Sequence, residues 1–593
     1  MVRKIVLSIM AVLAISFVAF AQNLQVTGTV KDATGNPVVG AAVFVEGTTV
    51  GTTTGVDGSF KLQVPADGNL FVSFMGYEDV KVAVDGKSVV NVVLKDDYQS
   101  IDEVVVQTFG EVKKKDLTGS ITAVSSKDLQ KMTVSSVTKA LEGAAPGVQT
   151  YSSSGQPGFD SSIIIRGMGS INGNTGALIV VDGVPYSSAL TTINPLDIES
   201  MVVSKDAAAN ALYGSRAANG VVFITTKKGA RNQKANITFE AKWGWNEIGV
   251  KEHETMTNPG DYYEYVFAGL RNYATDATGD AAFGQQWANR NLMGALGNYM
   301  AYRLPEGKSV AAGDTPINPE TGKIWDGMEL LYADNYDDYL FTKQFRQEYT
   351  VSISGGNQKV DYYVSGSFLD DPSYVIESAF KRYSGRASLN AQVNKNIKLG
   401  TNVSFTRRDI DNPGYSGANT SSVFMWTLWQ NPTVPYYARD LDGKIIRNAD
   451  GSKMFDQGGG QTLSPYGYTE DMFNAFANYA NPEQIFSRNI NQEIRDNIYA
   501  NAYIDITFLK DFKFTANFTL DNIYRLDTYY SNNEYGSAAK STYNGIVEKY
   551  VNNYTSINTQ QLLNYHKVLN EVHTIDAMIG HEFHKSSDSS VDA

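Results

Sequence analysis

The sequence predicts a mainly β protein with three successive parts: a small β-sandwich, an α+β domain, and strands of an antiparallel transmembrane β-barrel. Three observations support this fold class. Short strands separated by tight-turn residues come first, and glycine-rich turns between strands and short helices come next. The rest of the chain carries segments of about ten residues in which apolar and polar side chains alternate, the length and period of a membrane barrel strand.

Composition narrows the class of protein. The chain has 593 residues, more than one domain usually needs, and a net charge of −13, which argues against a nucleic-acid partner because phosphates require a basic surface. The absence of cysteine excludes disulfide frameworks and thiolate metal sites. Aromatic residues make up 11%, including 35 tyrosines, which is too many for a disordered chain and suits β-structure.

Residues 1–21 are predicted to be a signal peptide. Arg3 and Lys4 precede an apolar run that extends to Phe20, and Ala19-Phe20-Ala21 is a small-x-small cleavage motif, so cleavage is expected near Ala21. The alternative is a transmembrane anchor, but the run is shorter than the ~20 residues that a spanning helix requires. No later stretch reads as a spanning helix, so a membrane location requires a β-barrel.

Residues 22–96 are predicted to form the β-sandwich, with Asp57-Gly58 as a tight hairpin turn. Residues 97–116 form a linker. It contains Ile101–Gln107, a β-branched run with no obvious partner strand nearby. Such a segment can add to the sheet edge of another protein; the alternative is an edge strand of the sandwich.

Residues 117–229 are predicted to be the α+β domain, with a helix over Lys205–Tyr213. We expect Gly147, Gly167, Gly183 and Gly214 to occupy turns or close backbone approaches. Arg166 and Arg216 are expected to pair with buried carboxylates, and the nearest candidates are Asp182, Asp197 and Glu199. These residues either hold this domain in its fold, which we favour, or contact a substrate.

Residues 230–593 contain nine barrel-like segments. They lie near 235–248, 347–355, 359–370, 382–393, 397–409, 494–507, 512–521, 556–568 and 572–583. Every second connection is short and the others are long, as in a barrel that is inserted from the periplasm. Trp243 and Trp245 share one face of the first segment and resemble girdle residues.

Nine strands are too few for a closed barrel around an internal domain, because plugged transporters have roughly 22 strands. The last residues, Lys585 to Ala593, are polar and unlike a final membrane strand. We therefore expect a truncated, incomplete barrel that would not transport by itself, with two unpaired edges in lipid.

No pattern typical of an enzyme or a metal site is present. The histidines of His581-Glu582-Phe583-His584 are three residues apart, not the four of a zinc protease. We expect no cofactor and no metal. Trp426, Trp429, Tyr436 and Tyr437 in a long loop are candidate substrate contacts, since flat aromatic faces with polar neighbours suit sugars; a loop core or a lipid-interface belt is the alternative.

Two regions carry family resemblances. Gly28-Thr29-Val30, Thr53 to Phe60 and Gly76-Tyr77 resemble the carboxypeptidase regulatory-like domain, which implies no catalysis here. Six motifs in order resemble the plug domain of SusC/RagA-type TonB-dependent receptors, and the resemblance continues past it. They are Pro146-Gly147-Val148, Ser154 to Gly158, Ile165-Arg166-Gly167, Val181 to Pro185, Asn194 to Ser200 and Tyr213 to Gly220.

The resemblance implies a function. Residues Asp102, Glu103, Val104, Val105 and Val106 match the position of a Ton box, the strip that TonB of the inner membrane grips. It further implies TonB-dependent import of an oligosaccharide or peptide across the bacterial outer membrane. The barrel would be surrounded by outer-membrane lipid, and a SusD-type surface lipoprotein would be the partner. The alternative is a non-transporting surface adhesin or sensor on the same scaffold. A siderophore receptor is less favoured, because the β-sandwich extension is typical of nutrient importers.

Overall fold

A computed structural model describes most of the chain. The described residues are 23–32, 35–46, 48, 50–74, 77, 80–94, 104–107, 110–113, 121–126, 136–143, 145–152, 155–159, 161–170, 175–205, 211–250, 254–412, 422–467, 481–536, 539, 542–569 and 573–593. They fall into two compact units, residues 1–105 with 111–118, and residues 106–110 with 119–593. The predicted signal peptide and two Ton box residues, Asp102 and Glu103, lie outside the described residues.

The first unit contains the predicted β-sandwich. A three-stranded sheet has the order β4-β1-β7 and a four-stranded sheet the order β3-β2-β5-β6. Strict alternation in β4 buries Phe60, Leu62 and Val64 and leaves the residues between them exposed, which is how one strand covers a core and faces water. The strands are β1 Asn23–Lys31, β2 Ala42–Val45, β3 Gly51–Thr53, β4 Ser59–Pro65, β5 Asn69–Ser73, β6 Val80–Ala83 and β7 Val92–Val93.

The Ton box candidate has a partner strand. Strand β8, Val104–Gln107, pairs with β9, Gly110–Lys113, in a two-stranded sheet. The expectation that this run has no strand partner nearby was therefore wrong. The next few residues supply one, because a two-residue connection is enough for a hairpin.

The α+β domain is confirmed. Its main sheet has the order β10-β15-β16-β13-β14, in which β13 and β16 are parallel, and β11 pairs with β12 beside it. Its elements are β10 Ile121–Ser125, α3 Val137–Ala140, β11 Val148–Tyr151, β12 Ser162–Ile165, β13 Leu178–Val181, β14 Val184–Pro185, η3 Leu190–Thr192, η4 Pro195–Asp197, β15 Ile198–Ser204, η5 Ala211–Ala217 and β16 Val221–Thr226.

Only part of the helix predicted over Lys205–Tyr213 can be compared with the structure. Residues 206–210 lie outside the described residues, and Ala211–Ala217 is the 3₁₀ segment η5. Gly214 has φ 60° and ψ −145°, a conformation that only glycine adopts readily, so it kinks this segment after Tyr213.

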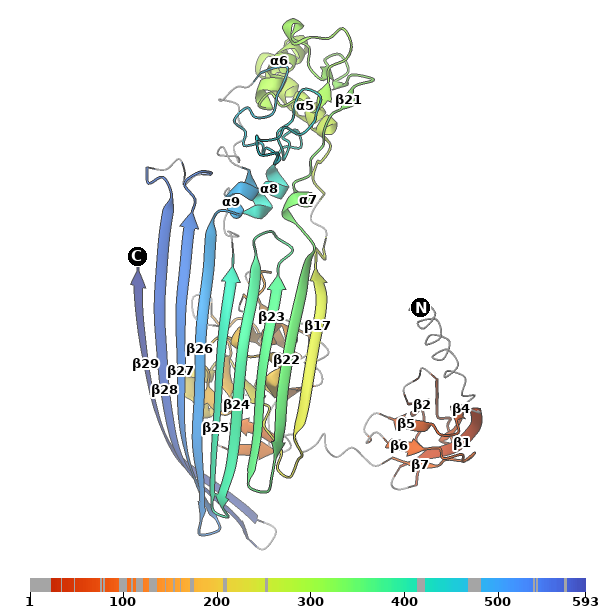
Figure 1. Ribbon diagram of the computed structural model, residues 1–593, viewed down its shortest axis with the longest axis vertical. Coiled ribbons are helices and arrows are strands. Elements are labelled where there is room, and N and C mark those ends of the chain that lie inside the picture. Colours follow the sequence, from red (N-terminus) through yellow and green to blue (C-terminus); the bar gives the residue numbers. More distant parts are fainter. Residues whose placement is uncertain are drawn as a thin grey trace, which may run out of the picture. The chain divides into compact units, whose positions relative to one another are not determined.

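Nine long strands form one antiparallel sheet in sequence order, from β17 to β29 (Figure 1). Each predicted segment coincides with one of them. The strands are β17 Asn236–Asn246, β22 Gln344–Gly356, β23 Val360–Pro372, β24 Ala379–Asn394, β25 Ile397–Asp411, β26 Ile490–Phe508, β27 Phe512–Ser531, β28 Ile546–Leu569 and β29 His573–Asp592. The last four have 19 to 24 residues, about twice the expected length, because ladder pairing continues through polar stretches that no longer alternate.

This sheet is apolar on its outer face and polar on its inner face. In β23, Asp361 and Ser365 are buried while Val364 between them is 47% exposed. The same inversion holds for Arg382 and Asn402, which are buried, and for neighbours such as Phe405, which are exposed. A soluble sheet does the opposite, so this arrangement is that of a membrane barrel wall.

Aromatic side chains form a row on the outer face. Tyr349 lies opposite Phe368, which in turn lies opposite Tyr383. Trp243 is 61% exposed and donates a hydrogen bond from its indole nitrogen to the Tyr349 hydroxyl at 3.0 Å. The row has the character of an aromatic girdle, as predicted for Trp243.

The sheet has two edges among the described residues, β17 and β29. Strand β29 continues through the polar stretch to Asp592, and Asp592 pairs with Tyr550 of β28. The ninth predicted segment ended at residue 583, whereas the strand extends to Asp592. Backbone pairing to β28 is available whatever the side chains are, and these side chains are exposed.

The described parts of the two longest connections contain helices and short strands. The connection after β17 contains α5 Pro259–Thr278, α6 Ala281–Ala295, β18 Tyr302–Arg303, η6 Val310–Ala312, β19 Ile317–Asn318, β20 Lys323–Ile324, β21 Glu329–Leu330 and α7 Asp337–Leu340. The connection after β25 contains α8 Val423–Trp429 and α9 Pro482–Phe486. Among the residues the structure describes, no helix is both long and apolar enough to cross a membrane.

Candidate functional site: the seat of the plug on the barrel wall

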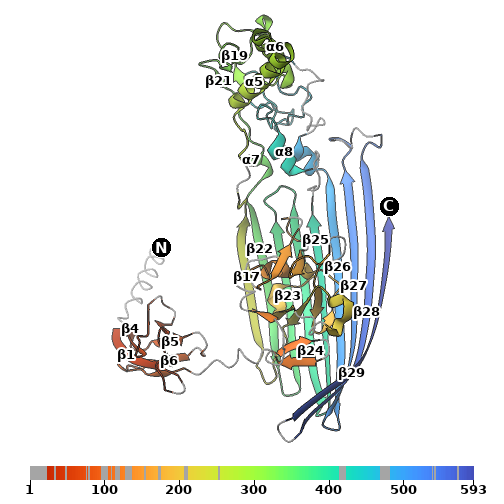
Figure 2. The same ribbon diagram turned by 180° about the vertical axis from the view of Figure 1, so that it is seen from behind.

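The α+β domain lies against the inner face of the nine-stranded sheet (Figures 1 and 2). Buried polar side chains join the two, and on the side of the inner domain most of them come from the stretch between β13 and β16. The contacts bridge residues more than 150 positions apart in the sequence. This interface is the candidate functional site, because any movement of the inner domain must break it.

The centre of the interface is the Asp182 cluster, defined as Asp182, Thr226, Arg386 and Asn402. Asp182 follows β13 with φ +47°, a conformation found in tight turns. Its carboxylate accepts hydrogen bonds from the Thr226 amide at 3.0 Å and hydroxyl at 2.5 Å, and from the Asn402 amide at 2.8 Å. Arg386 of β24 lies 3.3 Å away as its ion-pair partner.

The electrostatics of Asp182 follow from these contacts. Burial alone would raise the pKa of the carboxyl. The positive charges of Arg386 and Lys228 and the hydrogen bonds from Thr226 outweigh burial and hold the pKa below its ordinary value. Asp182 is therefore a buried carboxylate, charged at neutral pH, that joins two strands of the inner domain to two strands of the wall.

A second contact group surrounds Ser188 and Asp521. The Ser188 hydroxyl donates to the two Asp521 oxygens at 2.9 and 3.1 Å. The Asn497 amide donates to Ser188 at 2.8 Å and to Asp521 at 2.9 Å. The Tyr186 and Tyr499 rings pack edge to face beside them, 5.4 Å apart. No sequence pattern pointed to these residues.

The η3 and η4 segments are held by the wall as well. Arg382 and Thr406 donate to the main-chain oxygens of Thr191 and Thr192 at 3.3 and 2.9 Å, and Arg408 bonds the Thr191 hydroxyl. Asp197, a predicted site residue, accepts from the Tyr363 hydroxyl at 2.8 Å.

The expected partners of Arg166 and Arg216 were wrong. Asp182 pairs with Arg386, Asp197 with Tyr363, and Glu199 is exposed on β15. Arg216 forms an ion pair of 3.1 Å with Glu582 of β29. Sequence proximity suggested partners within the inner domain, whereas the sheet supplies them from strands hundreds of residues later.

The four glycines predicted to occupy turns or close backbone approaches have backbone conformations that favour glycine. Gly147, Gly167, Gly183 and Gly214 all have positive φ, between 60° and 91°. At Gly147, Gly167 and Gly214 an added Cβ would meet nothing within 4 Å, so the backbone conformation, not space, is what requires glycine there.

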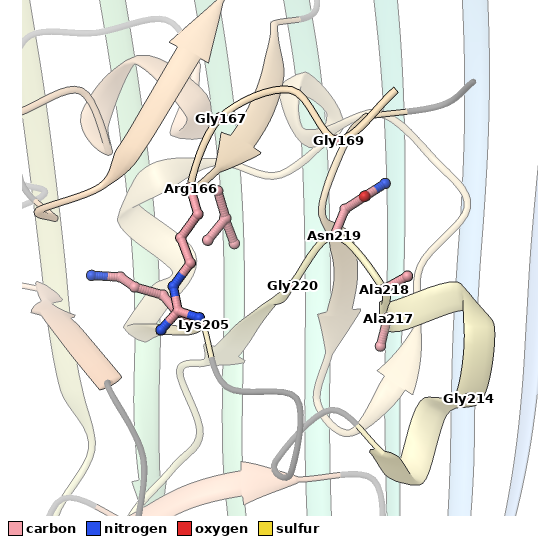
Figure 3. A pocket seen from close by; sticks show the side chains of 10 residues that line it. Arg166, Gly167, Gly169, Lys205, Gly214, Ala217, Ala218, Asn219 and Gly220 are labelled. Atoms are coloured by element: carbon pink, nitrogen blue, oxygen red, sulfur yellow. The ribbon is translucent and has the colours of Figure 1, made fainter. Parts of the chain in front are cut away.

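Arg166 and Lys205 line a cavity of about 410 Å³ in the inner domain (Figure 3). Glycine and alanine residues make up most of the remaining lining. Arg166 is exposed and has φ +61°. Lys205 donates to the Thr122 hydroxyl at 3.0 Å, which connects β10 to the end of β15.

The loop aromatics divide into two kinds. Trp426 and Tyr436 are 1% and 0% exposed and lie in a core with Tyr336 and Phe486, so in this structure they are part of the loop core. Tyr437 is half-buried against Phe455, and Trp429 is 56% exposed. The candidate substrate contacts that remain accessible are therefore Trp429 and part of Tyr437.

Comparisons with known proteins agree with this fold. Residues 113–221 match the TonB-dependent Receptor Plug Domain, and residues 26–106 match the CarboxypepD_reg-like domain. TonB-dependent receptor SusC of Bacteroides thetaiotaomicron is 33% identical over 74% of this chain. TonB-dependent receptor P26 of Formosa agariphila is 29% identical over 96% of it. The chain spans 38% and 50% of the lengths of these two relatives.

Among solved structures, the RagAB peptide importer in its open-open state superposes with a TM-score of 0.61 over 83% of this chain and 50% of that chain, at 24% identity. The fold and the matches together define a TonB-dependent receptor whose plug domain is seated on a β-barrel wall. More narrowly, the chain is a homologue of SusC and is of the SusC/RagA type.

Proposed function

We propose that this chain takes part in the TonB-dependent import of a nutrient, an oligosaccharide or a peptide, across the bacterial outer membrane. The observation that carries the proposal is that the plug contacts the barrel wall through polar groups, which we call the polar seat of the plug. The Asp182 cluster, the Ser188–Asp521 contact and the Asp197–Tyr363 contact use hydrogen bonds and one ion pair. Water can replace such contacts when the plug moves, whereas separating an apolar interface would expose hydrophobic surface.

The energy for that movement would come from TonB. The Ton box, Asp102 to Val106, precedes the first plug strand β10 by about fifteen residues of chain. Its β-branched residues suit strand addition, in which main-chain hydrogen bonds supply the affinity. The pairing of β8 with β9 would have to open or be extended when TonB binds.

The remaining assignments rest on the relatives. A SusD-type lipoprotein is proposed as the extracellular partner, because the plug motifs resemble those of SusC/RagA-type receptors and the chain is similar to SusC. We propose an outer-membrane location with the apolar outer face of the sheet in lipid, after cleavage of the signal peptide near Ala21. We further propose that the protein is not an enzyme and needs no cofactor; its relatives are named receptors and importers.

The test uses the absence of cysteine from the chain, since one introduced thiol is then unique. Gln107→Cys is crosslinked to a single-cysteine TonB in cells, with and without Val105→Pro, and Val105→Thr is the matched control. Proline removes a main-chain donor and threonine keeps it. We expect at least a tenfold loss of crosslink for V105P and little change for V105T.

The same cells separate import from the alternative function. Deleting Asp102–Val106 from the chromosomal gene should abolish uptake of the nutrient that induces its expression. Equal crosslinking in V105P, or unchanged uptake after the deletion, would favour the surface adhesin or sensor instead.

A further inference from the structure

One side chain of the barrel wall belongs to the hydrophobic core of the plug. Among the described residues, the buried apolar side chains of that core come from positions 124–224, except for Tyr499 of β26. Tyr499 is 2% exposed, and β26 runs beside the plug in Figure 2. Asn497 and Asn501, two positions away on the same face of β26, are buried as well. Tyr499 therefore projects from a polar inner face into the plug, as an apolar contact within the polar seat.

The Tyr499 ring is held by a tyrosine of the plug. It packs edge to face on Tyr186, with ring centroids 5.4 Å apart and an angle of 66° between the rings. The Tyr186 hydroxyl is hydrogen-bonded. It lies 2.5 Å from the Thr192 hydroxyl and donates to the side-chain oxygen of Asn497 at 3.5 Å. The two rings thus face each other across the seat, one from the plug and one from the wall.

The hydroxyl of Tyr499 differs from that of Tyr186. It is fully buried and has no hydrogen-bond partner among the described residues. The charges that act on it come from both contact groups of the seat, Asp182 with Arg386 on one side and Asp521 on the other. Both carboxylates are already occupied by the donors described above. A buried hydroxyl that makes no hydrogen bond lowers the stability of the arrangement that buries it.

We propose that Tyr499 is a positioning residue that limits how tightly the plug is held. Its ring fills the plug core and sets the position of the plug, while its unbonded hydroxyl opposes the seated state. When the plug moves away, water can bond the hydroxyl, so the hydroxyl favours the moved state over the seated state. Phenylalanine would keep the ring and remove this penalty. The proposal rests on the proposed function, which requires the plug to move.

The test follows plug movement through a thiol on the wall that the plug covers. Thr350 of β22 is 6% exposed, and its hydroxyl accepts a hydrogen bond from the Asn194 amide of the plug at 3.3 Å. The chain has no cysteine, so Thr350→Cys introduces a single thiol, shielded while the plug is seated. The rate at which excess thiol reagent labels it follows the population of the moved state. The whole chain is used in detergent without TonB, and every variant carries the same Thr350→Cys background.

Two phenylalanine variants should move the labelling rate in opposite directions. Tyr499→Phe removes an unbonded hydroxyl, so labelling should be slower by about fivefold or more. Tyr186→Phe removes a bonded hydroxyl and leaves the Thr192 and Asn497 groups without it, so labelling should be faster by about fivefold or more. Tyr524→Phe is the matched control, since Tyr524 is 38% exposed, and it should stay within about twofold of the parent.

A fourth variant tests the ring. Tyr499→Ala empties the space that the ring fills in the plug core, so it should label faster than Y186F. General loosening of the chain would speed labelling in every variant, which is why the slower labelling of Y499F is the decisive result. The proposal is overturned if Y499F labels as fast as the parent or faster, or if Y499A labels at the parental rate. Because TonB is absent, these outcomes leave the Ton box crosslink, and with it the import proposal, to be judged separately.

Discussion

The Asp182→Asn substitution tests whether the polar seat holds the plug on the wall. Asparagine keeps the size of the side chain but removes the charge that Arg386 faces at 3.3 Å in a buried site. It also replaces one acceptor oxygen by a donor, opposite the Thr226 and Asn402 donors. Removing one partner of a buried ion pair costs about 3–5 kcal/mol, and we expect a loss of that size in the free energy of plug unfolding.

Urea unfolding of the plug measures this loss. A fluorescent thiol probe at one introduced cysteine on the plug reports its release, since the chain has no other cysteine. With a slope of about 1–3 kcal/mol per molar urea, the midpoint should fall by at least about 1 M. Glu199→Gln, an exposed acid on neighbouring strand β15, is the control and should stay within about 0.5 kcal/mol of the parent. An equal effect of D182N and E199Q would refute the reasoning.

Two further predictions follow from the same contacts. Because the folded-state pKa of Asp182 is lowered, its stabilising contribution is complete above the unfolded-state pKa of about 3.9. This contribution is lost as the pH falls through the folded-state pKa. The free energy of plug unfolding, measured against pH, should show this loss in the parent and not in D182N. Trp426→Ala should destabilise the folded loops by about 3–5 kcal/mol, because the Trp426 side chain is 1% exposed. Trp429→Ala should change the stability of the loops by less than about 0.5 kcal/mol. Protease resistance of the loops measures both effects, and equal sensitivity of the two variants would contradict the burial of Trp426.

The sequence predicted what depends on neighbouring residues. Alternation with a period of two located all nine wall strands, because each strand must present one face to the plug and the other outward. Gly147, Gly167, Gly183 and Gly214 were identified as turn residues because their backbone conformations are local properties. The plug motifs were recognised in the same way, through short ordered stretches.

The long-range partners could not be predicted in this way. Asp182 and Arg386 are 204 residues apart, and Ser188 and Asp521 are 333 apart. Which wall residue faces a plug residue depends on the register of every intervening strand, and a slip of one residue would turn each inward side chain outward. The local sequence therefore suggested Arg166 and Arg216 as partners of the plug carboxylates. In the structure, Asp182 pairs with Arg386 and Asp197 accepts a hydrogen bond from Tyr363.

The long connections show the same division. From the sequence, Trp426, Trp429, Tyr436 and Tyr437 were one aromatic stretch, predicted to contact a sugar or, as the alternative, to form a loop core or a lipid-interface belt. Folding of α8 against α7 and α9 buried Trp426 and Tyr436 and left Trp429 beside a pocket. The sequence by itself determined that aromatic side chains gather in this loop; only the tertiary structure decided which of them reach solvent, because burial depends on contacts with segments far away in the chain.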